Sequence, residues 1–283
     1  MNGPLIRNVS DTARWVATYR AMETARPDAL FRDPFADRLA GERGRQIVRE
    51  LPRGEESAWA MVVRTVVFDE MILAAIERGA DAVLNLAAGF DARPYRLPLR
   101  PDFPWFEADL APLLAEKEEA LAGETPVCRL ERRGVDLSDR NARNALFSEV
   151  ASVGRNVFVL SEGLVTYLTQ EQVAGLARDL HGAMNLRHWA LDMASPLLLR
   201  MAKRTWSRHL KQAPFRFAPA SGERFFAAYG WRPAETRYSF DEGERLDRRP
   251  PFGWFAKASW RLLPEPLRRP LRSMGKLIRF ARI

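Results

Sequence analysis

Acidic residues follow four short apolar runs of the sequence, and their spacing suggests a binding site for a polar ligand. The runs begin at Val83, Phe103, Gly134 and Asn156, and the acids that follow them are Asp91, Asp109, Asp136 and Glu162. Such runs predict parallel strands that are covered on both faces. Because ligands of open α/β sheets bind at the carboxyl ends of the strands, we expect the four carboxylates to share one site.

The turn Ala87-Ala88-Gly89 and Asp109 together indicate a nucleoside site. The three small residues allow backbone N–H groups to approach a ligand closely, and Asp109 lies about 20 positions beyond Gly89. An acidic residue at this distance from a glycine turn accepts hydrogen bonds from ribose hydroxyls in dinucleotide-binding folds. For the turn alone, an ordinary strand-to-helix connection in which Gly89 only relieves strain is an equal alternative.

Arg64 is a charged residue within an apolar helix that the pattern predicts over 57–78. Its neighbours at helical spacing are Ala60, Met61, Val67 and Phe68. The guanidinium therefore points into an apolar face, where it keeps its charge and needs an anion. That anion is either a protein carboxylate, such as Asp69 or Asp91, or an anionic group of a ligand.

The composition is that of an ordinary globular chain. Of 283 residues, 47% are hydrophobic and 28% are charged, and no run reaches the roughly 20 apolar residues of a membrane span. No secretory signal is recognisable, so we expect a cytoplasmic protein. The single cysteine excludes an internal disulfide, and three histidines without ligand spacing predict no metal site.

The net charge of +8 is concentrated near the C-terminus. Seven basic residues between Arg261 and Ile283 stand against Glu265, so this segment supplies +6. Nucleic-acid enzymes more often spread basic and aromatic residues over a binding face, and we therefore expect no nucleic-acid partner. The segment 261–283 predicts a basic amphipathic helix. Packing on its own domain is favoured over docking on a membrane surface or an acidic partner.

Helices and strands alternate in the order that a parallel sheet requires. Beyond 57–78, helices are predicted over 10–25, after Asp33-Pro34, from the capping box at Thr169 to Met184, and over 221–229. Further strands are predicted over 187–193 and near 235–240, whereas the pattern weakens over 195–221.

Four segments carry a family resemblance: Leu84–Arg96 (LNLAAGFDARPYR), Glu107–Leu110 (EADL), Val135–Asp139 (VDLSD) and Ser161–Leu168 (SEGLVTYL). Together they resemble the leucine carboxyl methyltransferase family of S-adenosylmethionine-dependent enzymes, which includes bacterial polyketide O-methyltransferases. The resemblance covers about residues 10–195, although many members have glycine at the position of Ala87. It implies an α/β, Rossmann-like class I methyltransferase fold with a seven-stranded, mostly parallel sheet flanked by helices.

A single methyltransferase domain, 1–283, is expected. Its parts are an N-terminal helical cover (1–56), a cofactor-binding core (57–194), a variable cap (195–221), a C-terminal part of the sheet (222–260) and the basic tail (261–283).

The resemblance also implies roles for single residues. Arg64 would bind the methionyl carboxylate of the cofactor, Ala87, Ala88 and Gly89 would border its methionyl part, Asp109 with Leu110 would bind the ribose, and Asp136 with Leu137 would bind the adenine. Glu162 would face the amino or sulfonium end. Glu162 and Tyr167 are the catalytic candidates, His209 is a further acceptor-side candidate, and Thr12 and Trp15 are candidates for the pocket wall.

The predicted activity is methyl transfer from S-adenosylmethionine to a carboxylate or hydroxyl of a small-molecule acceptor, for example a polyketide-like one. One alternative is a nicotinamide-dependent oxidoreductase, which normally needs a fuller glycine fingerprint and a catalytic Tyr-Lys or His pair. The other is a non-catalytic protein that binds through the basic tail. The sequence indicates neither the acceptor nor the oligomeric state.

Overall fold

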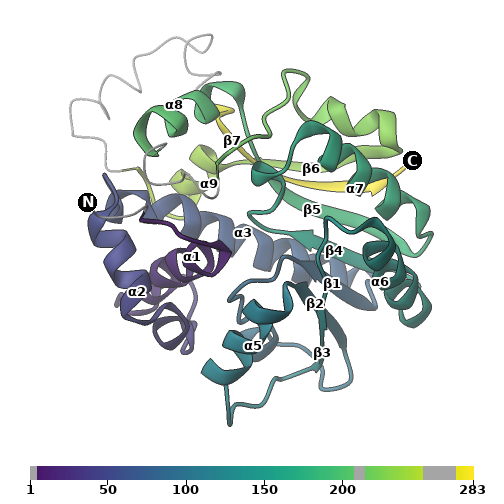
Figure 1. Ribbon diagram of the computed structural model, residues 1–283, viewed down its shortest axis with the longest axis horizontal. Coiled ribbons are helices and arrows are strands. Elements are labelled where there is room, and N and C mark those ends of the chain that lie inside the picture. The colour runs from purple at the N-terminus through teal and green to yellow at the C-terminus, as the bar shows by residue number, and fades with distance from the viewer. Residues whose placement is uncertain (1–4, 207–213, 251–271) are drawn as a thin grey trace.

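A seven-stranded sheet forms the centre of the computed structural model, which describes residues 5–206, 214–250 and 272–283 (Figure 1). The strands are β1 (Ala82–Leu86), β2 (Pro104–Asp109), β3 (Arg129–Gly134), β4 (Val157–Ser161), β5 (Leu186–Ala194), β6 (Trp231–Tyr238) and β7 (Gly275–Arg282). Their order in the sheet is β3-β2-β1-β4-β5-β7-β6. The first five strands are parallel, and β7 runs antiparallel to both β5 and β6. The predicted mostly parallel sheet is confirmed.

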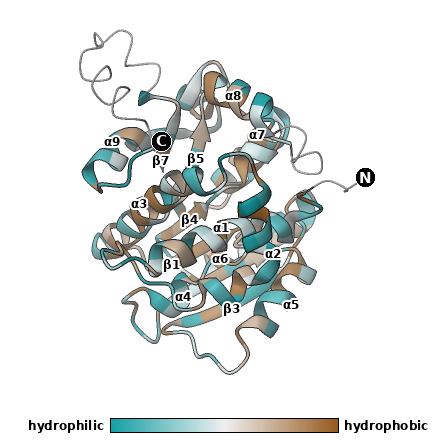
Figure 2. Cartoon of the chain, turned by 90° about the vertical axis from the view of Figure 1, so that its left-hand side faces the viewer, coloured by the Kyte–Doolittle hydropathy of each residue, from teal (hydrophilic) through white to brown (hydrophobic). Residues whose placement is uncertain are grey.

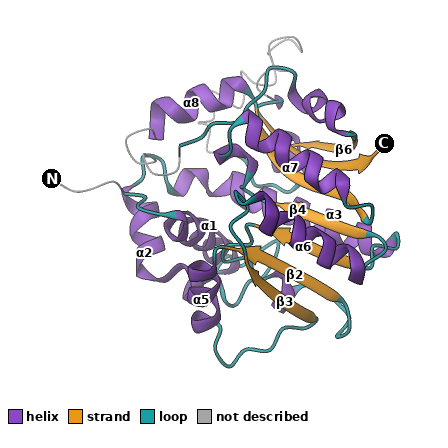
Figure 3. Cartoon of the chain, turned by 45° about the vertical axis from the view of Figure 1, so that its right-hand side comes forward, coloured by secondary structure: helices purple, strands orange, loops and turns teal. Residues whose placement is uncertain are grey.

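Helices cover both faces of the sheet and the carboxyl ends of its strands. They are α1 (Val9–Thr24), α2 (Ala36–Glu50), α3 (Ala58–Glu77), α4 (Arg93–Arg96), α5 (Ala111–Ala120), α6 (Arg140–Val153), α7 (Gln170–Gly182), α8 (Pro196–Trp206) and α9 (Ser239–Arg245), with 3₁₀ turns η1 (Glu55–Ser57), η2 (Val165–Tyr167) and η3 (Gly222–Tyr229). The predicted capping box begins α7, and the side chain of Asn8 caps α1, which begins at Val9. Figure 3 shows α1 and α2 beside the end of the sheet toward which β2 points.

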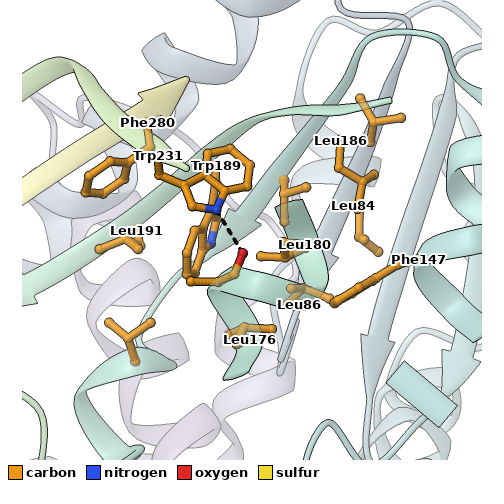
Figure 4. Close-up of a cluster of buried hydrophobic side chains, with 14 of the residues drawn as sticks. Leu84, Leu86, Phe147, Leu176, Leu180, Leu186, Trp189, Leu191, Trp231 and Phe280 are labelled. Atoms are coloured by element: carbon orange, nitrogen blue, oxygen red, sulfur yellow. Dashed lines mark hydrogen bonds between the residues drawn. The ribbon is translucent and has the colours of Figure 1, made fainter. Parts of the chain in front are cut away.

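Successive residues of the inner strands point to opposite faces of the sheet, so each of these strands contributes side chains to two hydrophobic cores. Leu84 and Leu86 belong to the core under α6 and α7, where Trp189 and Trp231 also pack (Figure 4). Val83 belongs to the core under α3. Figure 2 shows that α3 is largely hydrophobic, in keeping with its burial against this second face. Both faces are therefore apolar, as the uninterrupted runs of the sequence predict.

The predicted C-terminal amphipathic helix is wrong where the structure describes that segment. Residues 275–282 form β7, and Leu277, Ile278 and Phe280 are buried. Hydrogen bonding to two neighbouring strands outweighs the local helical periodicity, because strand formation depends strongly on tertiary context. Residues 251–271, which include the rest of the predicted helix, lie outside the described residues.

Three other boundaries differ from the prediction. β3 lies at 129–134 and ends where the predicted run begins, at Gly134, because an edge strand tolerates the alternating charges of Arg129, Glu131 and Arg133. β6 begins at Trp231 and ends at Tyr238 rather than near 235–240. The weakly patterned segment 195–221 contains the helix α8.

Among the described residues, no helix is both long and apolar enough to span a membrane.

Candidate active site

Two adjoining cavities lie at the carboxyl ends of the parallel strands. The large cavity, of about 690 Å³, is lined by residues of α1, α3, α8, the ends of β1, β4 and β5, and the start of β7. The side cavity, of about 480 Å³, lies beside the ends of β2 and β3 and next to α7. Ala87 and Asp109 line both cavities. A ligand could therefore extend from one cavity into the other past the β1 turn.

Arg64 points from α3 into the large cavity, where its side chain meets two carboxylates. Its Nε donates to Glu162 Oε1 at 2.9 Å and its Nη1 to Asp192 Oδ2 at 3.2 Å. Within the described chain, Nη2 makes no hydrogen bond. Burial acts to lower the pKa of Arg64, but Asp192 and Glu162 outweigh it and raise that pKa. The guanidinium therefore stays charged and keeps one N–H edge for a ligand.

The protein partners considered for Arg64 at the sequence level bind another arginine instead. Arg93, only 2% exposed, donates from Nε to Asp69 Oδ1 at 2.6 Å and from Nη1 to Asp91 Oδ2 at 2.6 Å. Its Nη1 also lies 2.8 Å from Glu162 Oε2. Glu162 thus bridges the two buried arginines. Arg93 was not predicted as a site residue, because within the segment Leu84–Arg96 it has no distinct pattern of its own.

The turn after β1 approaches the tip of β2 closely. Gly89 N donates to Asp109 Oδ2 and Leu110 N donates to Asp109 Oδ1, each at 2.7 Å. Ala87 and Gly89 adopt φ of 54° and 49°, in the left-handed region that disfavours residues with a Cβ by about 1 kcal/mol or more. Ala87 therefore adopts the backbone shape that glycine would take more easily.

Asp109 is well placed to receive further hydrogen bonds. It is 8% exposed and lines both cavities, and each of its oxygens keeps lone-pair capacity beyond the backbone N–H that it accepts. Burial raises its pKa, and the N–H groups of Gly89 and Leu110 act against that rise. Hydroxyl donors would relieve the desolvation of this carboxylate.

The predicted adenine-site residues lie in the side cavity. Asp136 and Leu137 line it together with Leu110, and Asp136 is exposed. Ser138 N donates to Asp136 Oδ1 at 2.8 Å, and hydrogen bonding from Ser138 lowers the pKa of Asp136. Leu137 is half-buried and packs against the adjacent core. Arg64 lines only the large cavity, and Asp136 and Leu137 line only the side cavity; Ala87 and Asp109 lie between them, because they line both.

Glu162 and Tyr167 both line the large cavity. Burial acts to raise the pKa of Glu162, but Arg93 and Arg64 outweigh it and hold that pKa below its ordinary value. Burial raises the pKa of Tyr167 to about 12. Thus Glu162 is ionised and Tyr167 carries its hydroxyl proton at neutral pH.

Asp192, near the end of β5, is a candidate site residue that was not predicted from the sequence. Besides pairing with Arg64, it accepts a hydrogen bond from Gly163 N at 2.6 Å. Its position within the predicted strand 187–193 was available as a signal, since it continues the pattern of acids near strand ends. Of the weaker candidates, Thr12 and Trp15 line the large cavity, whereas His209 lies outside the described residues.

Comparison with known proteins identifies the family. The model of the family described as "Leucine carboxyl methyltransferase" matches residues 13–181. The chain belongs to the leucine carboxyl methyltransferase family. The predicted family membership is therefore confirmed, and the fold and the cavities can be considered in that context.

Named relatives agree with this assignment. A "Putative S-adenosyl-L-methionine-dependent methyltransferase" of Mycolicibacterium gilvum is 30% identical over 272 residues, which cover 80% of this chain and 88% of the relative. A protein of the same description from Parafrankia sp. is 36% identical over 182 residues, covering 61% of this chain and 58% of the relative. This second match, and that to a Mycobacteroides abscessus relative at 61%, therefore span less than two thirds of the relatives' lengths.

Solved structures support the fold. A DUF574 family protein from Streptomyces avermitilis superposes with a TM-score of 0.61 at 15% identity, covering 96% of this chain and 97% of the other. A structure titled as a putative methyltransferase from Thermobifida fusca YX gives a TM-score of 0.54 at 14% identity, covering 99% and 95%. The predicted Rossmann-like class I fold is confirmed by these likenesses together with the sheet order.

Proposed function

We propose that the protein is an S-adenosylmethionine-dependent O-methyltransferase that acts on a small-molecule acceptor. The observation that carries the proposal is that two cavities adjoin at Asp109, with the buried Arg64 and the partly buried Glu162 and Asp192 in the large one and Asp136 in the side one. The names of the family and of the relatives support the same activity.

The donor set suits this cofactor. Arg64 has Nη2 available for a carboxylate, while Glu162 and Asp192 offer negative charge to an ammonium group. Asp109 has acceptor capacity for the two ribose hydroxyls, and Asp136 and Leu137 would hold the adenine in the side cavity. These roles follow the order of groups along S-adenosylmethionine.

S-adenosylmethionine held by these residues would supply an activated methyl group for transfer to an acceptor oxygen, with the sulfonium sulfur as the leaving group. The protein then contributes chiefly orientation and exclusion of water, which in well-oriented systems correspond to effective molarities of about 10⁵ M or more. Glu162, fixed by two arginines, holds a constant negative charge at this end of the cavity.

The state of the lining acids favours a carboxylate over a hydroxyl acceptor. Asp91, Glu162 and Asp192 are each bonded to an arginine, and Asp109 accepts two backbone N–H groups. No histidine is among the described residues that line the large cavity. A hydroxyl acceptor needs a base to remove its proton, whereas a carboxylate is already ionised at neutral pH.

The basic tail gives little support to the alternative of a binding protein without activity. In its described part, Lys276 pairs with Glu223, and Arg279 pairs with Glu235. Both residues belong to β7, which lies inside the sheet. Their charges are therefore largely committed to the fold.

Calorimetry with S-adenosylmethionine, S-adenosylhomocysteine and NAD tests the proposal. We expect the first two to bind and to raise the melting temperature, since a ligand of the native state stabilises it, and NAD to do neither. Asp109→Ala should weaken binding by more than about 1.5 kcal/mol, roughly tenfold, through loss of charged hydrogen bonds. Asp102→Ala, at an exposed carboxylate before β2, is the control. Equal affinity of the Asp109→Ala variant and the wild type would refute the ribose assignment.

A further inference from the structure

Four aromatic side chains form a wall of the large cavity. Trp15 of α1 meets Trp206 of α8 edge to face, with ring centroids 5.8 Å apart. Trp206 lies 6.5 Å from Phe215, and Phe215 lies 5.4 Å from Tyr167 of η2. All four residues line the cavity. We call this group the aromatic wall.

The aromatic wall is continued by aliphatic residues of the same elements. Leu198, Leu199 and Ala202 of α8 line the cavity, as do Met61 of α3 and Leu277 of β7. The residues proposed to bind the cofactor come mainly from the strand ends and the turns that follow them. The apolar part of the cavity is therefore left for the acceptor, and its aromatic and aliphatic surface suits a flat apolar molecule.

One cation at this wall differs from the others in the cavity. The described lining cations are Arg20, Arg64, Arg93, Arg216 and Lys276. Four of them pair with acids: Arg20 with Asp33, Arg64 with Glu162, Arg93 with Asp91 and Lys276 with Glu223.

The Arg216 guanidinium has no ion-pair or hydrogen-bond partner in the described chain, and its side chain is exposed. The backbone of Arg216 is nevertheless held, because its N–H donates to Thr166 O at 2.7 Å. Thr166 and Tyr167 both belong to η2, which follows Glu162 closely. Arg216 therefore carries an uncompensated charge in the lining of the large cavity, next in sequence to Phe215 of the aromatic wall and with its backbone bound to η2.

From this arrangement we infer that the acceptor is a flat, apolar carboxylic acid and that Arg216 is the residue that binds its carboxylate. Guanidinium and carboxylate groups form paired hydrogen bonds that fix orientation as well as position. A carboxylate held in this way keeps lone pairs on its oxygens for the new bond to carbon. The inference rests on the proposed function, since it assigns the acceptor of that same reaction.

Binding of matched acids and amides tests the inference. The probes are benzoate, 2-naphthoate and anthracene-2-carboxylate with their primary amides, measured by calorimetry or ligand-observed NMR on protein saturated with S-adenosylhomocysteine. We expect the acids to bind more tightly than the amides. Arg216→Ala should weaken the acids about tenfold or more and leave the amides unchanged. Arg216→Lys should restore part of the difference, because it keeps the charge but loses the planar pair of donors.

Two further variants separate charge from apolar contact. Trp206→Ala should weaken acids and amides alike, because it removes part of the aromatic wall. Arg200→Ala, at an exposed arginine of α8 that does not line the cavity, should change neither.

The outcomes for the inference and for the proposed function are distinct. Failure of the wild type to bind S-adenosylhomocysteine would overturn the proposed function. If S-adenosylhomocysteine binds normally, three results would overturn the inference and leave the proposed function intact. They are that no acid binds, that acids and amides bind equally, or that Arg216→Ala keeps the preference for acids.

Discussion

Replacement of Arg64 by methionine tests the part of the proposed cofactor site that binds the amino-acid carboxylate, independently of the part that binds the adenosine. Arg64 Nε and Nη1 are bonded to Glu162 and Asp192, so Nη2 is the edge available to the amino-acid carboxylate of the cofactor. One hydrogen bond between charged groups contributes about 1.5–3 kcal/mol. Arg64→Met should therefore raise the dissociation constant of S-adenosylhomocysteine roughly 10- to 150-fold.

A truncated ligand makes this prediction specific. The nucleoside 5′-methylthioadenosine has the adenine and ribose but lacks the amino-acid part, so Arg64→Met should leave its affinity within about twofold. Asp109→Ala should instead weaken both ligands, because both contain the ribose. Isothermal titration calorimetry on each variant gives the four dissociation constants.

Stability must be measured beside affinity, because Arg64 also neutralises two acids. After Arg64→Met, Glu162 keeps Arg93 and Asp192 keeps the Gly163 N–H, so part of the network survives. Arg248→Met is a suitable control, since Arg248 is a buried arginine paired with Glu23 and does not line either cavity. Equal loss of both ligands in Arg64→Met, or loss of neither, would refute the assignment.

Two further predictions concern the same network. Gly163 has φ of 70°, and an added Cβ would lie 3.4 Å from Arg64 Nη1. Gly163→Ala should therefore lower the free energy of unfolding in urea by about 1 kcal/mol and weaken the binding of S-adenosylhomocysteine. Gly182→Ala, where an added Cβ meets no atom within 4 Å, should do neither. Because Arg93 and Arg64 hold the pKa of Glu162 low, the stabilisation by its carboxylate is present above the unfolded carboxyl pKa of about 4.3 and is lost as the pH falls through the lower folded value. The stability difference between wild type and Glu162→Gln should therefore shrink between pH 5 and pH 3, and a constant difference would contradict this account.

The sheet, and the grouping of several candidate residues at one of its edges, could be predicted because their signals are local. Buried strands leave uninterrupted apolar runs, and the acids after them fall at one edge once the strands are parallel. Arg64 was found because a charge in an apolar helix face is conspicuous. In the structure it lies in the large cavity with Glu162 and Asp109, as expected.

The parts that were missed depend on contacts between distant segments. β7 has a helical pattern in sequence but pairs with both β5 and β6. The partners of Arg64 could not be assigned because Arg93 competes for Asp69 and Asp91. Asp192 had a local signal, since it stands near the end of a predicted strand, but its bond to Gly163 became visible only with the fold.

The position of β7 links the edge of the sheet to the large cavity. β7 follows β6 in the chain but lies between β5 and β6, so β6 reaches the rest of the sheet only through β7. Gly275, Lys276 and Leu277 also supply one side of the large cavity. The pairing of β7 with β5 therefore both attaches β6 to the sheet and supplies one side of the large cavity, so a change that displaced β7 would alter the sheet edge and the cavity together.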